Sequence, residues 1–547
     1  MQAMLLLAPF AILLLGMLGL ALCLWRRIPY AGLVVALSAS GAWLAALGWS
    51  LRLPLSMQLS AWPDAFRGLA TGLTLELDGL GWILAMAHLS LSLLIFLTGF
   101  TRPGGQRIRV RLAALLLTYA GLAVFLSHDL VTRLFAWTAL DAVVFVVYAL
   151  LARGAALPPQ AVRQLSFNAV ASGLVILGAL SAPPELRFGQ IGLAASYPTA
   201  AGFFLAAAAF RLGLFPLHVS VPQAAEVRQG LAVQLRLVPA LAGLELLCRL
   251  TIAGFSPDAR LWVSLLGAVA AWIGAVQVWN SLTVNDALPS LVIAVSGLAA
   301  VASQWAGLTA VVTLALAMTL GGGLLFLSRG FDPQRRWLTI FPALGLAALV
   351  GVPGTPGFLA LVELAGAARA ISGWAWLWLI VIGGAWVMLG AGLWRVLTWP
   401  AEPLHGAAAG LALYVTGVAL ATLTILFVGI GPQVLSTLTG IAEFELTARD
   451  APDLILAAGL AAIVVGLGFA LWRAENIVRA FGEGWSRSGP GAVGASALRF
   501  DGPLRLIWWS LTAFSRLVGA GVAILEGAGG PFWVIAFIVA VALAFRP

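Results

Sequence analysis

An arginine stands inside an apolar segment, about one helical turn before a proline, in the stretch Arg211-Leu212-Gly213-Leu214-Phe215-Pro216-Leu217-His218. A charged side chain within a membrane segment is costly and therefore indicates a functional site. Proline removes a backbone donor, and helices interrupted at bilayer depth are typical of ion-transport proteins. This stretch predicts a broken transmembrane helix that carries a buried charge.

Apolar segments recur along the rest of the chain. The 547 residues are 62% hydrophobic and only 9% charged, with a mean hydropathy of +1.03. Segments of this kind cross a hydrocarbon layer roughly 30 Å thick when they reach about 20 residues. We predict an all-α polytopic membrane protein with about 16 transmembrane helices. The predicted helices cover residues 4–25, 29–51, 80–100, 111–127, 131–152, 162–180, 199–217, 231–253, 261–281, 288–304, 308–328, 338–362, 373–397, 408–430, 453–472 and 529–545.

The net charge of +9 comes from arginine, since the sequence contains no lysine. Arginines gather at alternate helix ends, for example at Arg26, Arg102, Arg153, Arg335 and Arg473. Basic residues mark the cytoplasmic side of membrane proteins. Topology thus explains the charge without a nucleic-acid partner. It predicts an integral protein of a membrane such as the bacterial inner membrane, with both termini on the outer face.

The two cysteines, Cys23 and Cys248, lie far apart in apolar segments. They form no ligand-spaced motif, so we expect neither a disulfide nor an iron–sulfur or zinc site. No nucleotide-binding loop, flavin site or quinone pocket is visible in the sequence. We therefore expect no bound metal or cofactor.

Two helix breaks organise the predicted architecture. Pro216 interrupts the seventh helix, with Pro222 beyond its end, and Pro353 and Pro356 interrupt the twelfth. The breaks lie five helices apart, an odd number, so the units around them would be inverted repeats of the kind found in transporters. Packing alone is the alternative for either break. The predicted parts are residues 1–110 (helices 1–3), 111–253 (first repeat, helices 4–8), 261–397 (second repeat, helices 9–13), 408–472 (helices 14–15) and 473–547.

The last part combines three predicted features. A linker rich in Gly and Ser covers residues 482–497. Apolar residues then recur at helical spacing through residues 503–526, which predicts an amphipathic helix along the membrane surface. An ordinary connecting helix is the alternative. A final transmembrane helix follows.

Ionisable residues inside or near the apolar segments are the candidates for an ion path: Asp141, Arg211, His218, Arg236, Glu245, Asp286 and Glu363. A relay needs groups with two accessible protonation states. Neutralising a lysine at pH 7 costs about 4.6 kcal/mol, whereas an arginine costs roughly 9 kcal/mol. Arg211 should therefore stay charged and hold an acid, either Asp141 or Glu226. The alternatives are a purely structural ion pair at Arg211 and a hydrogen-bonded histidine at a helix boundary for His218. His88 and His405 are isolated in the sequence.

Several motifs in order resemble the antiporter-like, proton-translocating subunits of respiratory complex I (NADH-quinone oxidoreductase; chains L, M and N) and of Mrp-type cation/proton antiporters. The resemblance is nearest to chain L. The motifs are Leu77-Asp78-Gly79-Leu80, Ser127-His128-Asp129-Leu130 with Phe135-Ala136-Trp137-Thr138, Arg211 to His218 with Pro222-Gln223-Ala224, Gly351 to Phe358 with Glu363, and Phe427 to Pro432. The resemblance implies an ion-translocating subunit without redox chemistry, which works with other membrane subunits in the lipid bilayer.

The chain departs from this family pattern at the relay positions. Thr138 replaces a glutamate and Arg211 a lysine, while Gly322 falls where a lysine is expected. Asp141, one turn beyond Thr138 on the same helix face, is the expected substitute for the missing acid. The resemblance therefore implies proton or cation translocation by a modified relay. The alternatives are a non-conducting scaffold subunit and a membrane partner of an inorganic-carbon-accumulating complex.

Overall fold

The computed structural model describes residues 2–28, 30–61, 72–101, 108–127, 129–151, 159–183, 186, 189–214, 217, 229–328, 336–370, 373–399, 404, 408–441 and 451–486. Within these residues, thirteen helices are long and apolar enough to cross a membrane. The predicted polytopic, helical integral membrane protein is thereby confirmed. The number of about 16 helices and the inverted repeats stay predictions.

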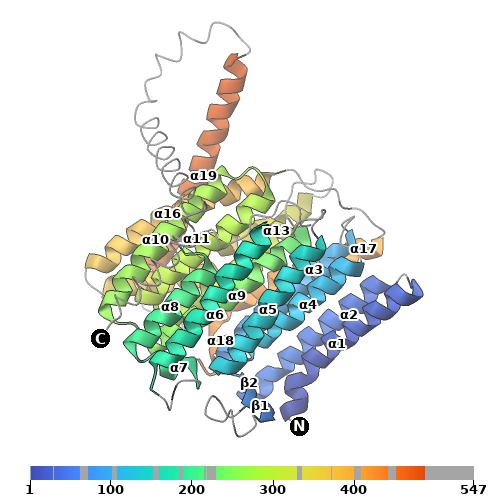
Figure 1. Ribbon diagram of the computed structural model, residues 1–547. Helices are drawn as coiled ribbons and strands as arrows, with labels where there is room; N and C mark the ends of the chain where they lie inside the picture. The colour runs from blue at the N-terminus through green and yellow to red at the C-terminus, as the bar shows by residue number, and fades with distance from the viewer. Residues whose placement is uncertain are drawn as a thin grey trace. The chain divides into compact units, whose positions relative to one another are not determined.

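The first half of the described chain contains eight helices and a β-hairpin (Figure 1). Their bounds are α1 (Gln2–Arg26), α2 (Ala31–Leu47), β1 (Leu55–Ala61), β2 (Gly72–Leu77), α3 (Gly79–Thr98), α4 (Ile108–Phe125), α5 (Leu130–Leu151), α6 (Pro159–Ser181), α7 (Ile191–Ala194) and α8 (Pro198–Leu212). The second half contains α9 (Gln229–Ala253), α10 (Pro257–Asn280), α11 (Val284–Trp305), α12 (Gly307–Leu316), α13 (Gly323–Ser328), α14 (Ile340–Val350), α15 (Pro356–Ala370), α16 (Gly373–Thr398), α17 (Ala408–Ile430), α18 (Pro432–Thr439) and α19 (Ala451–Ser486). A π-helical segment, Ala317–Gly322, joins α12 to α13.

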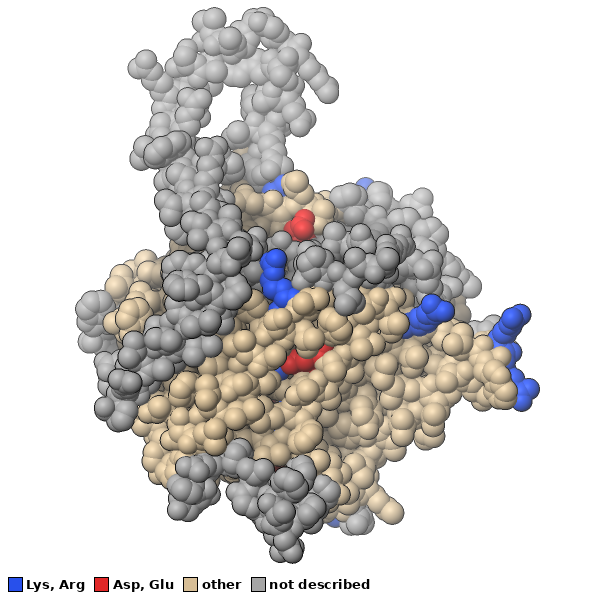
Figure 2. Space-filling model, in the orientation of Figure 1, with Lys and Arg blue, Asp and Glu red and all other residues tan. Residues whose placement is uncertain are grey.

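The core consists of helices that have no exposed face. The most apolar stretches of α3, α9 and the α12–α13 span are buried throughout, and the few polar side chains in them are buried as well. Consecutive helices from α1 to α6 pack against one another and lie side by side (Figure 1). The described surface in view is almost entirely uncharged (Figure 2). Exposed leucines such as Leu15 and Leu37 suit a surface that faces lipid.

Both predicted breaks coincide with the same type of helix end. Gly213 follows α8 with φ 63°, and Gly351 follows α14 with φ 80°. In each case the glycine and the next residue donate their N–H groups to one alanine carbonyl, that of Ala209 or Ala347. These left-handed ends satisfy a carbonyl that a broken helix would otherwise leave without a partner.

The second break is described on both of its sides. The predicted helix 338–362 is two helices, α14 and α15, and Pro356 is the first residue of α15. Between them, the Thr355 hydroxyl donates to Val352 O over 2.7 Å. At the first break, α8 ends at Leu212 rather than at residue 217. Pro216, Pro222 and His218 lie outside the described residues.

Three local features differ from the prediction. The β1–β2 hairpin was not predicted, although Leu73, Leu75 and Leu77 alternate with polar residues at the spacing of a strand. The π-helical segment interrupts a predicted continuous helix. The helix α19 continues to Ser486, so the first residues of the predicted linker are helical. The predicted surface helix 503–526 and last span 529–545 lie outside the described residues.

The chain forms two compact units, Met1–Gly468 and Phe469–Arg546. The first unit contains every described helix and strand up to the middle of α19. The predicted candidate residues therefore all fall in the first unit.

The left-handed glycines generate a stability prediction. Gly351→Ala should reduce the free energy of unfolding by more than the cost of left-handed strain, which is about 1–2 kcal/mol. The added Cβ would lie 2.6 Å from Leu361 Cδ1, whereas a Cβ at Gly254 (φ 84°) would meet nothing within 4 Å. Gly254→Ala is therefore the matched control, measured by unfolding of the purified protein in detergent. Equal losses for the two variants would contradict the packing argument.

Candidate functional site

A buried ion pair joins α5 to α8. Arg211 Nη2 lies 2.7 Å from Asp141 Oδ2, and Nη1 lies 3.3 Å from Oδ1. Asn168 on α6 donates to Asp141 Oδ1 over 2.9 Å. The Arg211 and Asp141 side chains are only 1% and 6% exposed. Three helices thus meet at one carboxylate, and both of its oxygens accept hydrogen bonds.

An aromatic ring completes the surroundings of this arginine. The guanidinium carbon of Arg211 lies 3.7 Å from the centre of the Trp137 ring. Trp137 and Asp141 are four residues apart on α5, so both face the same neighbour. A cation stacked on an aromatic face is stabilised further where water is excluded. Of the two acids considered for Arg211, Asp141 is the partner in the structure, and Glu226 lies outside the described residues.

A second charged network lies between α3, α5 and α9. Arg133 donates to both carboxylate oxygens of Glu245, over 2.5 and 2.8 Å. Arg249 Nε donates to Glu245 Oε1 over 2.9 Å, and its terminal nitrogens bind Asp78. Asp78 also caps the first turn of α3, where it accepts from Gly81 N. Two acids and two arginines balance each other in the protein interior.

Sequence reasoning selected Glu245 but missed the two arginines that hold it. Arg249 could have been found, because a Glu and an Arg four residues apart face each other on a helix. Arg133 could not, because it is 112 positions away from Glu245. Only the packing of α5 against α9 brings that pair together.

The remaining candidates fall into separate places. Arg236 is buried on α9 and interacts electrostatically with Tyr148 and Asp286. Asp286 accepts a hydrogen bond from the Thr283 hydroxyl over 2.6 Å in the first turn of α11. Glu363 is buried on α15, the helix that follows the second break. The structure therefore pairs Asp141 with Arg211, while Glu245 belongs to the second network and Arg236, Asp286 and Glu363 lie on α9, α11 and α15.

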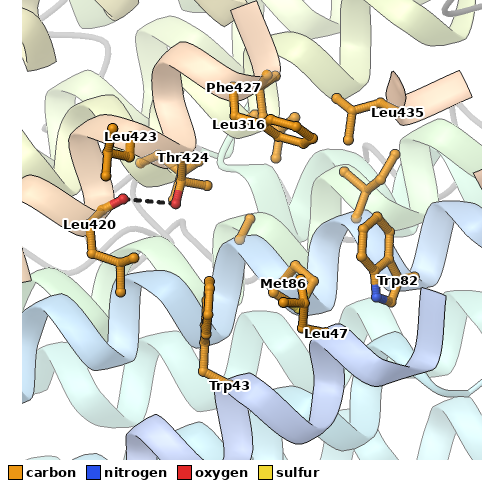
Figure 3. Close-up of a pocket in the computed structure, with 14 residues that line it drawn as sticks. Trp43, Leu47, Trp82, Met86, Leu316, Leu420, Leu423, Thr424, Phe427 and Leu435 are labelled. Atoms are coloured by element: carbon orange, nitrogen blue, oxygen red, sulfur yellow. Dashed lines mark hydrogen bonds between the residues drawn. The ribbon is translucent and has the colours of Figure 1, made fainter. Parts of the chain in front are cut away.

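An apolar pocket of about 280 Å³ lies between α2, α3, α12, the π-helical segment, α17 and α18 (Figure 3). Trp43, Trp82 and Phe427 contribute aromatic rings to its lining. The Thr424 hydroxyl donates to Leu420 O over 2.9 Å, as the dashed line in Figure 3 shows. None of the residues that line the pocket is charged, so it is unsuited to a bare ion.

Metal ligands are not grouped in the described part of the chain. No set of three or more His, Cys, Asp or Glu residues there could hold a metal ion. The charged groups of the site pair with one another instead.

Solved structures provide the comparison. The chain is similar to a chain of the Mrp complex from Dietzia sp. DQ12-45-1b, with a TM-score of 0.69 and 18% identity over 100% of this chain. It is also similar to a chain of respiratory complex I from Thermus thermophilus, with a TM-score of 0.62 and 19% identity, over 85% of this chain and 100% of that one. The chain therefore shares its fold with chains of these two membrane complexes.

This shared fold confirms, at the level of the fold, the resemblance that the sequence motifs carry. The chain spans 63% of the length of the matched Mrp chain. No protein-family model and no curated protein matches the sequence.

The buried pair generates a prediction about stability. Arg211→Met should cost about 3–5 kcal/mol, because it leaves the Asp141 carboxylate buried without its counter-charge. Adding Asp141→Asn should recover part of this loss, since the double variant no longer contains an unpaired charge. Unfolding of the single and double variants in detergent measures the coupling.

The matched control is the ion pair between Arg369 and Asp453, whose side chains are 37% and 11% exposed. Removing Arg369 should cost less than about 1 kcal/mol, because solvent screens a partly exposed pair. Additive losses at Asp141 and Arg211 would contradict a tight pair between α5 and α8.

Proposed function

We propose that the chain is an integral membrane subunit of a complex of the Mrp or complex I type, and that it takes part in proton or cation translocation through a modified relay. Its membrane would be a bacterial inner membrane, with both termini on the outer face. The fold, shared with chains of two multi-subunit membrane complexes, supports this proposal. Other membrane subunits would be its partners.

The observation that carries the proposal is the Asp141–Arg211 pair at the end of a broken helix. Arg211 lies two residues before Gly213, where α8 ends. A buried carboxylate beside a fixed guanidinium is coupled to it, because a proton on Asp141 leaves the Arg211 charge uncompensated. Such an uncompensated charge costs several kcal/mol in a low dielectric. Proton uptake would therefore be linked to movement of the ionic partner or of a second ion.

In this mechanism Asp141 carries the proton and Arg211 sets the electrostatic field. Asn168 holds the carboxylate in place from α6. The guanidinium itself does not release a proton, because its ordinary pKa is too far above the working pH. In the relay, Asp141 would thus take up and release the proton, and Arg211 would not.

A scaffold without conduction is the second candidate, and one observation favours it. Arg211 is held by both oxygens of Asp141 and by the Trp137 ring. A pair that is satisfied in this way also braces α5 against α8. In this role the chain would hold neighbouring subunits together, and the pair would contribute to rigidity alone.

Ion flux separates the two candidates. In vesicles that contain the chain with its co-purified partners, Asp141→Asn should reduce proton flux at least roughly tenfold, equivalent to a barrier increase of ~1.4 kcal/mol. Arg211→Lys should retain flux, because the charge stays and the amine can also release a proton. Asp453→Asn, outside the candidate path, is the control. Flux that is unchanged in Asp141→Asn and in Arg211→Met would favour the scaffold.

Partner identity provides an independent check. Affinity purification of the intact chain from gently solubilised membranes should recover other polytopic membrane subunits. Recovery of a soluble zinc protein in place of membrane subunits would instead favour an inorganic-carbon-accumulating complex. A chain that purifies alone and still transports ions would contradict the subunit proposal.

A further inference from the structure

Four polar side chains form a cluster in the apolar interior, away from the charged pairs. This His88 cluster consists of His88 and Ser92 on α3, Thr118 on α4 and Gln234 on α9. Gln234 Nε2 lies 2.9 Å from Thr118 Oγ1 and 3.3 Å from Ser92 Oγ. His88 Nε2 lies 2.9 Å from Thr118 O. His88, Thr118 and Gln234 have no exposed surface.

The hydrogen bonds fix which ring nitrogen of His88 carries the proton. Thr118 O can only accept, so Nε2 is the donor in this contact. In the neutral imidazole Nδ1 is then an acceptor, and it has no hydrogen-bond partner among the described residues. A buried acceptor without a partner is unusual in a folded protein.

Gln234 presents a second acceptor of the same kind. Its amide nitrogen also donates to Ala114 O over 3.1 Å, which fixes the orientation of the amide group. The Gln234 Oε1 atom is then buried, and no described residue donates a hydrogen bond to it. Like His88 Nδ1, this oxygen can accept a hydrogen bond but cannot donate one.

The hydroxyl groups of the cluster have no donor to spare. Ser92 donates to His88 O over 2.9 Å, and Thr118 donates to Ala114 O over 2.8 Å. Two acceptors therefore remain, and no donor from the described part of the chain is bonded to them. An anion does not fit, because it adds further lone pairs. A bare metal cation lacks the carboxylates that would neutralise it. The ligand must bring O–H or N–H groups.

We propose that the His88 cluster is a buried water site, in which water donates to His88 Nδ1 and to Gln234 Oε1. Buried waters in proteins occupy polar places of this kind and make two to four hydrogen bonds. The site is independent of the Asp141–Arg211 pair, since none of its residues belongs to α5 or α8. It stands whether or not the chain translocates ions.

The packing around the cluster explains why α4 carries a glycine at this level. A Cβ at Gly121 would lie 2.8 Å from His88 Cε1, from His88 Nε2 and from Val238 Cγ1. The imidazole therefore lies directly against the backbone of α4, close to α9.

Water-edited solid-state NMR tests the proposal on the full chain in liposomes, with uniform ¹⁵N labelling. The sequence contains four histidines, and His88→Gln assigns the His88 ring resonance. We expect magnetisation from water to reach His88 Nδ1 faster than it reaches the backbone amides of α3. Gln234→Met should roughly halve this transfer, because the variant removes one of the two acceptors that hold water in the cluster.

Ser90→Ala is the matched control. Ser90 lies on the same helix and is buried, but it accepts from Trp43 Nε1 and is outside the cluster. This variant should leave the transfer to His88 unchanged. Transfer to His88 that is no faster than to the α3 backbone would overturn the proposal. If His88→Gln does not fold, a high-resolution density map of the unsubstituted protein decides the question. A peak within hydrogen-bond distance of Nδ1 supports the site, and continuous side-chain packing there overturns it.

Discussion

The structure depends on neutralising guanidinium groups inside a bundle of apolar helices. A buried charge is tolerated when an opposite charge and further hydrogen bonds compensate for the water that it loses. Arg211 meets this condition with Asp141, and Arg133 and Arg249 meet it together with Glu245 and Asp78. Each cluster connects helices that are distant in the sequence, so the same contacts that neutralise charge also set how the helices are arranged.

The use of arginine in place of lysine gives these clusters their character. A guanidinium presents several donors in one plane and can bind both oxygens of a carboxylate while its face stacks on an aromatic ring. Asp141 and Trp137 exploit both properties of Arg211. A lysine at this place would be a smaller, more mobile charge that titrates more easily. Arg211 is thus a fixed positive charge that the carboxylate and the ring hold in one orientation.

Much of the architecture follows from sequence, because length and apolarity alone define a span. The break after Val350 was also predictable, since Gly351 and two prolines follow each other closely. Side-chain pairs were predictable from sequence in two cases only. Glu245 and Arg249 lie four residues apart on one helix, and Arg211 had two candidate acids to choose from. Arg133 with Glu245, and His88 with Thr118 and Gln234, required the packing of separate helices. The hairpin was missed because its apolar residues alternate over a segment too short to span a bilayer.

The π-helical segment changes how the chain can be aligned with its structural relatives. A π-bulge contains one residue more than the corresponding turn of α-helix, so side chains after Ala317–Gly322 are rotated by about 100° relative to an uninterrupted helix. If the residues of α12 and α13 are placed on one regular α-helix, each residue of α13 is assigned to a helix face that is wrong by one residue position. Gly322, which falls where the family pattern places a lysine, lies inside this segment. The true counterpart of that lysine must be sought by superposition of the backbones, on a helix face that a gap-free alignment does not reveal.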